Sequence, residues 1–381
     1  IYQRFAYLKN YSSTKMKIEE GWLLEDSFSE IKGHTFFGYY DKSSFSKSGH
    51  LLTHVVSNNT CSIYIRTASG ELVKVAETDA WNWQQGSMAT WLNDDCIGFN
   101  DIVDERAVFC IYSLKQRRVM HTHNDALQSY SSINNVYASI SYEKLNSLRP
   151  EYGYKKLTNI DFDNNEGIKI LKTFSGKCIH NIKLDEIILF LGLSDTVENS
   201  KLNHCLFSPN GNLVLFMYRT FRNNGKYSYL LAWDYENNKL IKLMDDRVVS
   251  HYSWIDDSQI IVWGRVENQT GYHTVNIGKK SNLLKFNNPL LLGDGHPSVC
   301  KKNNKKILTD TYPDKARVST LFLLSTVTGK EEKITQLKQP WKFNGFNRVD
   351  LHPRFNHDCS LITLESGHTG SRRQYILRKI K

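Results

Sequence analysis

The chain has 381 residues, of which 40% are hydrophobic and 23% are charged, and this mixture excludes an intrinsically disordered chain. Tyr and Phe are abundant, at 20 and 18 residues, whereas Pro occurs only 7 times, so the composition favours strands over helices. No run of about eighteen apolar residues occurs, so we expect no membrane-spanning helix. The net charge of +10 favours either an anionic partner or a surface that keeps the protein soluble.

The N-terminal sequence and the cysteines indicate in which cellular compartment to expect the protein. The stretch from Ile1 through Lys17 lacks the apolar core of a signal peptide, so we expect a cytoplasmic or periplasmic protein, with a removed leader as the alternative. The 7 cysteines are an odd number, and no CxxC pair occurs among them. We therefore expect scattered free thiols rather than a disulfide framework.

A repeated unit runs along most of the chain. Each copy begins with a short strand that carries an apolar residue. A polar turn and three further strand-like runs follow. The aligned apolar residues are Phe45, Trp91, Phe207, Trp254, Val299 and Phe355, and the remaining copy lies at Tyr130 to Val136. Seven copies at a spacing of roughly forty to fifty residues are typical of the blades of a β-propeller. We therefore predict an all-β fold, a seven-bladed β-propeller that forms a single domain over residues 1–381.

The ends of the chain should meet in the last blade. Only three strand-like runs follow His352, and they end at Arg378. An N-terminal strand, Trp22 to Asp26, would complete this blade and remove an exposed sheet edge.

An insertion at about 141–201 interrupts the repeat. Tyr142 to Leu148 has the pattern of a helix, and Asp185 to Leu193 fits either a strand or a helix. Long ordered insertions often carry function, and a surface excursion without function is the alternative.

Four histidines occupy the same position of the repeat, just before the first strand of a copy. They are His204, His251, His296 and His352. In a propeller this position lines one mouth of the central channel, so we expect the four side chains to converge. Converging imidazoles can bind a divalent metal or act as a general acid and base. Capping of blade turns through backbone hydrogen bonds is the structural alternative.

Further polar and aromatic residues occur at equivalent or neighbouring positions of the other copies. We expect the following side chains to bind substrate: Tyr40, Lys42, Trp83, Gln85, Tyr130, Arg222, Arg354 and Arg373. The chain lacks the GxSxG, HExxH, Walker and Rossmann motifs, and it lacks the modules that read nucleic acids. We therefore expect no nucleic-acid partner, and the sequence leaves the oligomeric state open.

Several motifs resemble those of bacterial β-propeller polysaccharide lyases, the oligogalacturonate and ulvan lyases. The similar stretches are His34 to Asp41, Trp81 to Gly86, Arg149 to Tyr154, Asn203-His204, Ser250 to Trp254, Asp294 to Ser298, Asp310 to Asp314, Asp350 to Arg354 and Ser366 to Gly370. They span nearly the whole chain. The resemblance implies the propeller fold and β-elimination of an acidic, uronate-containing polysaccharide.

The resemblance also implies roles for individual residues. His204 and His251 would be the base and the acid, with Tyr218 or Tyr252 as a partner, and Arg219 would neutralise the uronate carboxylate. The residues implied as ligands of a divalent metal, manganese or zinc, are His296 and His352. The pectin-type metal set includes a Gln near the last histidine, whereas this chain reads Asp350-Leu-His-Pro-Arg354 there. The alternatives are a glycan-binding propeller without catalysis, serving surface-polysaccharide assembly, and a propeller that docks peptides.

Overall fold

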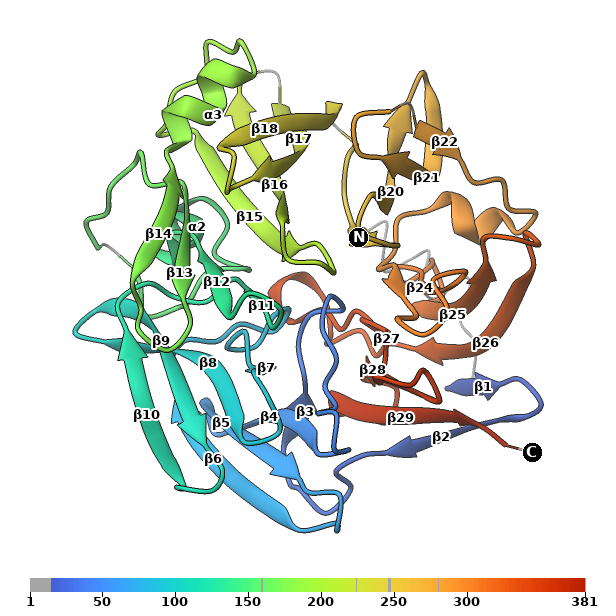
Figure 1. Ribbon diagram of the computed structural model, residues 1–381. Helices are drawn as coiled ribbons and strands as arrows, with labels where there is room; N and C mark the ends of the chain where they lie inside the picture. The colour runs from blue at the N-terminus through green and yellow to red at the C-terminus, as the bar shows by residue number, and fades with distance from the viewer. Residues whose placement is uncertain (1–14, 159, 224, 246–247, 280, 381) are drawn as a thin grey trace. The chain divides into compact units, whose positions relative to one another are not determined.

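The protein is a seven-bladed β-propeller, as the repeat predicts (Figure 1). The computed structural model describes residues 15–158, 160–223, 225–245, 248–279 and 281–380. Within them, strands form seven antiparallel sheets, six of four strands and one of five. Residues 1–14, which make up most of the stretch considered as a possible leader, lie outside the described residues.

The blades are numbered here in chain order. Blade 1 has β3 (His34–Phe36), β4 (Leu51–Ser57), β5 (Thr60–Arg66) and β6 (Leu72–Thr78). Blade 2 has β7 (Thr90–Trp91), β8 (Cys96–Val103), β9 (Arg106–Ser113) and β10 (Arg118–His123). Blade 3 has β11 (Ser129–Ser131), β12 (Val136–Ser139), β13 (Ile168–Lys172) and β14 (Cys178–Ile182). Blade 4 has β15 (Ser200–Phe207), β16 (Leu213–Arg222), β17 (Gly225–Asp234) and β18 (Lys239–Asp245).

The remaining blades follow the same plan. Blade 5 has β19 (Tyr252–Trp254), β20 (Gln259–Val266), β21 (Gln269–Asn276) and β22 (Ser281–Leu283). Blade 6 has β23 (Ser298–Val299), β24 (Lys306–Asp310), β25 (Val318–Ser325), β26 (Glu331–Lys338) and the added β1 (Met16–Ile18). Blade 7 has β27 (Arg354–Phe355), β28 (Leu361–Ser366), β29 (Arg373–Lys379) and β2 (Trp22–Asp26). Two short 3-10 helices, η1 (Pro289–Leu292) and η2 (Gly345–Asn347), lie in the connections.

The insertion belongs to blade 3 and contributes two of its strands, β13 and β14. The predicted helix is present as α2 (Tyr142–Leu148), and the Ser141 hydroxyl accepts a hydrogen bond from the Lys144 amide at 3.1 Å to cap it. The ambiguous segment forms a helix, α3 (Leu184–Phe190).

The chain divides by its internal contacts into two compact units. The first unit holds the described residues up to Glu77, His251–Ser253 and those from Leu284 onward. The second unit holds Thr78–Ser250 and Trp254–Leu283.

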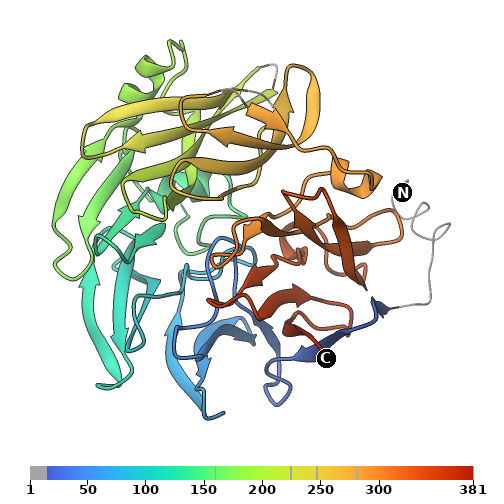
Figure 2. The same ribbon diagram turned by 45° about the vertical axis from the view of Figure 1, so that its right-hand side comes forward.

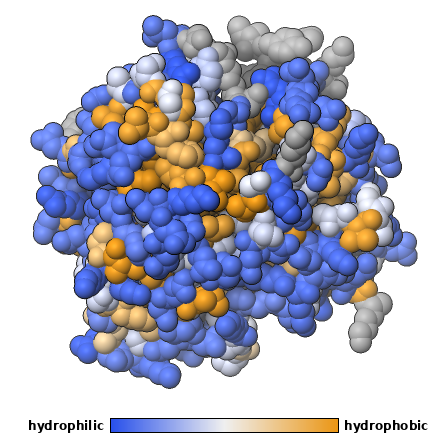
Figure 3. All heavy atoms as spheres, turned by 45° about the horizontal axis from the view of Figure 1, so that its top comes forward, coloured by the Kyte–Doolittle hydropathy of each residue, from blue (hydrophilic) through white to orange (hydrophobic). Residues whose placement is uncertain are grey.

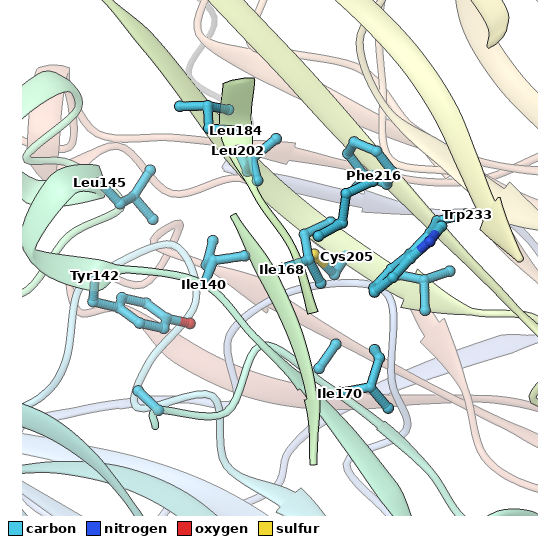
Figure 4. Close-up of a cluster of buried hydrophobic side chains, with 14 of the residues drawn as sticks. Ile140, Tyr142, Leu145, Ile168, Ile170, Leu184, Leu202, Cys205, Phe216 and Trp233 are labelled. Carbon is cyan, nitrogen blue, oxygen red and sulfur yellow. The ribbon is translucent and has the colours of Figure 1, made fainter. Parts of the chain in front are cut away.

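The core of the second unit is a buried apolar cluster around blades 3 and 4 (Figure 4). It includes Ile168 and Ile170 of β13, whose spacing of two residues places both on one face of the sheet. Cys205 and Phe216 of blade 4 belong to the same cluster. Burying one such aliphatic or aromatic side chain contributes about 1.5–3 kcal/mol, so this cluster holds together the sheets that carry the insertion.

The first unit contains the closing strand that the sequence predicts. Strand β2 pairs with β29, from Trp22 opposite Lys379 to Asp26 opposite Tyr375. Figures 1 and 2 show the N-terminal strand, in blue, alongside the C-terminal strand, in red. The Arg373 guanidinium fixes the end of β2 through the Asp26 carboxylate at 2.7 Å. Strand β1, which the repeat does not predict, adds a fifth strand to blade 6 by pairing with β26.

The expectation that all cysteines are free is wrong for two of them. Cys300 and Cys359 form a disulfide, with their Cα atoms 5.9 Å apart. Cys300 follows β23 and Cys359 precedes β28, so the bond joins turns of blades 6 and 7. A sequence separation of 59 residues hides this proximity, which arises because successive repeats place their turns side by side. The other cysteines are not in a disulfide: Cys61, Cys96, Cys110, Cys178 and Cys205.

In the described part of the chain, no helix has the length and apolar character that crossing a membrane requires. Hydrophilic residues cover most of the face shown in Figure 3, and hydrophobic residues form smaller patches among them.

The register of β2 gives a test of the closing strand. The Ser27 amide donates to the Gln374 carbonyl at 3.0 Å, and the Ile380 amide donates to the Gly21 carbonyl at 2.8 Å. Because hydrogen-bonded pairs alternate along an antiparallel ladder, the Leu23 amide faces β29 and the Leu24 amide faces away. The unfolding free energy of Leu23→Pro, measured by urea denaturation, should therefore be about 1–3 kcal/mol lower than that of Leu23→Ala.

The same comparison at Leu24 is the matched control. Leu24→Pro and Leu24→Ala should differ by much less, because the Leu24 amide makes no ladder hydrogen bond. If the Pro and Ala variants differ in unfolding free energy by the same amount at Leu23 and at Leu24, β2 does not pair with β29 in the register described.

Candidate functional site

Three of the four predicted histidines lie together in the first unit. The ring centre of His296 is 4.3 Å from that of His251 and 4.5 Å from that of His352. All three side chains are buried. Each precedes the first strand of its blade, β19, β23 or β27, so the shared repeat position brings them together. The fourth, His204, lies in β15 of the second unit, where it is buried and has a left-handed backbone with φ of 55°.

Hydrogen bonds to carboxylates orient two of these rings. The Asp310 Oδ1 atom is 2.8 Å from His296 Nδ1 and also accepts the His296 backbone amide at 2.8 Å. The Asp294 Oδ1 atom is 3.0 Å from His251 Nδ1. Burial lowers the pKa of His296, but the charge and hydrogen bond of Asp310 outweigh it, so the pKa is raised. In His296 the hydrogen bond at Nδ1 leaves Nε2 for a ligand or a proton.

The third ring is held by a backbone carbonyl. His352 Nδ1 lies 2.9 Å from the Gly38 carbonyl oxygen. A carbonyl only accepts hydrogen bonds, so Nδ1 carries the proton and Nε2 carries a lone pair. Burial lowers the pKa of His352 well below its usual value, and the neighbouring His296 and Arg354 lower it further. The ring is therefore a neutral imidazole, the form that binds metal ions.

A carboxylate completes a group of possible metal ligands with two of these histidines. One ligand atom from each of His296, Asp350 and His352 lies within 4.8 Å of the other two. His352 Nε2 and Asp350 Oδ1 are buried and have no hydrogen-bond partner among the described residues. Unpaired buried polar atoms are unfavourable, and a cation between them would satisfy both.

The chemistry of this donor set fits a divalent transition metal. Two imidazoles and one carboxylate are common ligands of zinc, manganese and iron. The Asp310 carboxylate at the far nitrogen of His296 is the kind of contact that orients a metal-ligating histidine. The second Asp350 oxygen accepts from Arg348 Nε at 2.9 Å, so the carboxylate itself is also held.

Asp350 is a candidate ligand that the sequence patterns do not indicate, since they single out His296 and His352. The signal was that Asp350, a carboxylate, lies only two residues before His352 in the chain.

Two adjacent tyrosines lie against the histidine cluster. The Tyr40 ring centre is 5.2 Å from that of His296, and the Tyr39 ring centre is 5.1 Å from that of His352. The Tyr40 hydroxyl donates to the Tyr252 carbonyl and accepts the Tyr252 amide, both at 3.0 Å. Burial raises the pKa of Tyr40 well above its usual value, so the hydroxyl keeps its proton. Tyr40 thus fixes the segment that begins β19 next to His251.

Three basic residues that we expect to bind substrate also lie in the first unit. Lys42 forms an ion pair with Asp41 at 3.1 Å. Arg354 is 1% exposed and donates to the Gly38 carbonyl at 3.0 Å, to the Thr363 hydroxyl at 3.1 Å and to Glu365 at 3.1 Å. Arg373 binds Asp26 as described above. The guanidinium groups of both arginines are therefore engaged with the protein itself.

In the second unit, two further predicted residues meet around a buried acid. The Tyr218 hydroxyl lies 2.8 Å from the Ser200 hydroxyl and 3.2 Å from Asp195 Oδ2. Arg222 holds Asp195 through two nitrogens at 2.7 and 2.9 Å. Burial raises the pKa of Tyr218, so it is protonated at neutral pH. Arg219 lies opposite Lys201 in the β15–β16 ladder and donates to the Ser228 hydroxyl at 3.2 Å.

Blades 2 and 3 carry the other three residues that we expect to bind substrate. Trp83 is partly exposed, and its ring lies edge-on to Trp81 with their centres 5.1 Å apart. Gln85 is buried, and its Oε1 has no hydrogen-bond partner among the described residues. The Tyr130 hydroxyl donates to the Leu92 carbonyl at 3.3 Å, and burial raises the pKa of Tyr130 to about 12.

The sequence matches no family model and no curated protein. Among solved structures, an oligogalacturonate lyase from Vibrio parahaemolyticus is similar, with a TM-score of 0.63 and 13% identity over 96% of this chain and 98% of that chain. The β-propeller domain of the Trilobed protease from Pyrococcus furiosus has a TM-score of 0.54 and 11% identity, over 91% of this chain and 97% of that chain. Kuenenia stuttgartiensis hydrazine synthase has a TM-score of 0.51 and 9% identity over the same shares. At these identities, and with such different proteins among them, the similarities show that the chain has the β-propeller fold and do not identify an activity.

Proposed function

We propose that this chain cleaves an acidic, uronate-containing polysaccharide by β-elimination, at a site where His296, Asp350 and His352 hold a divalent metal. One observation supports this most directly. Two buried ligand atoms without partners, His352 Nε2 and Asp350 Oδ1, lie beside a ring that can accept a proton, that of His251. The resemblance of the motifs to polysaccharide lyases supplies the substrate class.

The reaction needs three functions from the site. The bond between hydrogen and the carbon next to the uronate carboxylate breaks, and a base takes the proton. The electron pair forms a double bond to the adjacent carbon while the glycosidic C–O bond there breaks, and the leaving oxygen takes up a proton. Negative charge builds up on the carboxylate during this step, so a positive group must lie against it. When bound, a divalent cation would supply that positive charge.

His251 is the residue that we assign as the base. Its Nδ1 is held by Asp294 at 3.0 Å, which fixes the ring and stabilises the imidazolium that forms when Nε2 takes the proton. The 4.3 Å separation between its ring centre and that of His296 places this base next to the proposed metal ligands. The Tyr40 contacts to the Tyr252 backbone position the His251 segment.

Four more residues keep the roles that the resemblance implies, as part of the proposal. His204 is a second acid or base, with Tyr218 or Tyr252 as a partner, and Arg219 is an alternative neutraliser of the carboxylate. The metal is manganese or zinc, since both accept imidazole and carboxylate ligands.

The metal proposal predicts a stoichiometric ion in protein purified without chelator, as measured by elemental analysis. Removal of the ion should lower the thermal unfolding midpoint, and added Mn²⁺ or Zn²⁺ should restore it, because an ion that binds only the folded state stabilises it. Asp350→Asn and His352→Ala should each weaken metal binding by about tenfold or more, since each removes a ligand.

The control variants are His368→Ala, a buried histidine outside the group, and Asp358→Asn, an exposed carboxylate. Both should bind metal as the parent does. A parent protein that holds no ion, and whose unfolding midpoint does not respond to either cation, would rule out the metal site.

The catalytic proposal predicts that His251→Ala lowers kcat by about 10²–10⁴-fold, as expected for loss of a general base. The product is an unsaturated uronate, so initial rates are followed by its ultraviolet absorbance over a panel of acidic polysaccharides. The metal content and the unfolding midpoint of the variant should stay near those of the parent. The exposed His121 gives a matched control, and His121→Ala should keep full activity.

Two results would contradict this assignment. If His251→Ala unfolds earlier but keeps its specific activity, the histidine is structural. If the parent binds an acidic polysaccharide and forms no unsaturated product, the chain is instead a glycan-binding propeller.

A further inference from the structure

The disulfide of the first unit lies on the same two strands as the candidate metal ligands. His296 precedes β23, the first strand of blade 6, and Cys300 follows this strand directly. Asp350 and His352 precede β27, the first strand of blade 7, and Cys359 lies in the turn after it. Each strand therefore has candidate ligands before it and one half of the disulfide after it.

Backbone pairing holds these two strands only over a short length. Strand β23 is two residues long and pairs with β24 at Ser298 and Val299. Strand β27 is also two residues long and pairs with β28 at Arg354 and Phe355. The two strands belong to different sheets, so no ladder joins them to each other in the described chain. The disulfide, with its Cα atoms 5.9 Å apart, is a covalent link between the turns that follow them.

The position of one strand relative to the other decides how the ligand atoms are spaced. His296 comes from blade 6, whereas Asp350 and His352 come from blade 7, and their ligand atoms lie within 4.8 Å of one another. Asp310 links the two segments at this end, since it holds His296 Nδ1 at 2.8 Å and accepts the Leu351 amide at 3.1 Å. A metal ion needs its ligand atoms at about 2.0–2.3 Å, so a small displacement between the blades changes which ligands reach one ion.

The two cysteines differ in exposure, and this difference favours attack at one of them. Cys300 is 1% exposed, whereas Cys359 is partly exposed and lies between the exposed Asp358 and Ser360. Thiol–disulfide exchange begins when a thiolate attacks the accessible sulfur and the other sulfur leaves. The Asn303 amide donates to Cys300 Sγ at 3.2 Å, so a hydrogen-bond donor is already in place for the leaving thiolate.

The backbone at Cys359 also favours opening of the bond. Its φ of 60° lies in the left-handed region, which is unfavourable for a residue with a side chain, and opening allows the turn to relax. Strained or exposed disulfides are the ones that exchange readily. Five other cysteines are not in a disulfide, so this bond is not part of a framework like those of small secreted proteins.

We propose that Cys359 is a thiol-exchange site through which a dithiol reductant controls the candidate metal site. Opening of the disulfide loosens β23 and β27 and thereby weakens metal binding. The effect on metal binding rests on the proposed function, because it concerns the same ligands. The exchange itself and the loosening of the strands do not depend on it.

The exchange is balanced by the two electrons of the dithiol. Its first thiolate forms a bond to the Cys359 sulfur while the bond to Cys300 breaks, and Cys300 leaves as a thiolate. The second sulfur of the reductant then attacks the mixed disulfide and releases Cys359. The reductant leaves as a cyclic disulfide, and solvent protonates the released thiolates.

Coupling between the two sites must be reciprocal. If reduction weakens metal binding by some factor, a bound metal ion makes reduction less favourable by the same factor. A disulfide that only stabilises the fold behaves differently. Its loss lowers the unfolding midpoint and leaves the metal affinity of the folded protein unchanged.

The first experiment is titration of chelator-treated parent protein with Mn²⁺, before and after treatment with dithiothreitol, which is removed under anaerobic conditions. Mn²⁺ is the probe because it prefers oxygen and nitrogen ligands to thiolates, so the released cysteines do not add a site. The oxidised parent should bind Mn²⁺ at least about fivefold more tightly than the reduced parent, at a temperature where both are folded. Saturating Mn²⁺ should raise by the same factor the ratio of dithiol to its disulfide that half-reduces the bond.

Variants separate this bond from the other cysteines. The double variant Cys300→Ser with Cys359→Ser should bind Mn²⁺ as the reduced parent does and should not respond to the dithiol. Cys178→Ser, which removes an exposed thiol of β14, is the matched control and should respond as the parent does. If the double variant does not fold, the reduced parent gives the same comparison without a mutation. Equal Mn²⁺ affinity of the oxidised and reduced parent would overturn the control of the metal site.

The site of attack has its own test. After brief exposure of the folded parent to glutathione, free thiols are alkylated and the peptides are identified by mass spectrometry. Glutathione should be found on Cys359 and the alkyl group on Cys300. The reverse distribution, or a bond that resists glutathione and dithiol alike in the folded protein, would overturn the exchange site.

Amide hydrogen exchange distinguishes failure of this inference from failure of the metal proposal. Exchange over residues 296–300 and 350–356 should be faster in the reduced parent, and exchange in β20 of the second unit should be unchanged. A parent that binds no Mn²⁺ in either state would remove the metal site. Faster exchange of the two segments would then still support the loosening of the strands, and equal exchange would overturn it. A parent that binds Mn²⁺ equally in both states would keep the metal site and lose its control by the disulfide.

Discussion

A buried carboxylate, that of Glu365, holds together the part of the first unit that carries the histidine cluster. It is fully buried and accepts the backbone amides of Phe37 and Gly38 at 3.1 and 2.8 Å. Arg354 and Arg372 donate to its two oxygens at 3.1 and 3.4 Å. The Gly38 carbonyl, fixed in this way, accepts from His352 Nδ1. Loss of one partner from a buried ion pair costs about 3–5 kcal/mol, so this network resists disruption. It specifies where the His352 ring lies, and where Tyr39 and Tyr40, which follow Gly38, lie.

That constraint explains how unsatisfied ligand atoms persist next to the network. His352 has a left-handed backbone with φ of 43°, which is unfavourable for a residue with a side chain. Its Nε2 and the Asp350 Oδ1 atom add the cost of two buried polar atoms without partners. Such features remain only where the surrounding structure determines them, as the arginines and amides around Glu365 do here. The donor atoms of His352 and Asp350 are therefore held in position by the fold itself.

Features that repeat along the chain could be predicted from the sequence, and features that depend on single contacts could not. The spacing of the copies predicted seven blades, and the missing strand after His352 predicted the role of Trp22–Asp26. The shared repeat position also indicated the histidines that meet in the first unit. Nothing in the repeat distinguishes an arginine that binds substrate from Arg354, whose partners lie on the same blade and in a distant loop. The Cys300–Cys359 bond and the grouping of Asp350 with His296 and His352 likewise depend on contacts between adjacent blades or within one segment.

Several of the cations that contribute to the net charge of +10 lie inside the protein rather than on its surface. Arg354 and Arg372 are buried and share the carboxylate of Glu365, so both guanidinium groups are engaged inside the protein. Arg222 is likewise neutralised by Asp195. Lys201 is equally buried, yet it lies opposite another cation and has an amide oxygen as its partner. The excess of basic residues is thus not only a property of the surface. In blade 4 it includes a buried lysine, Lys201, and burial lowers the pKa of its amine well below the usual value.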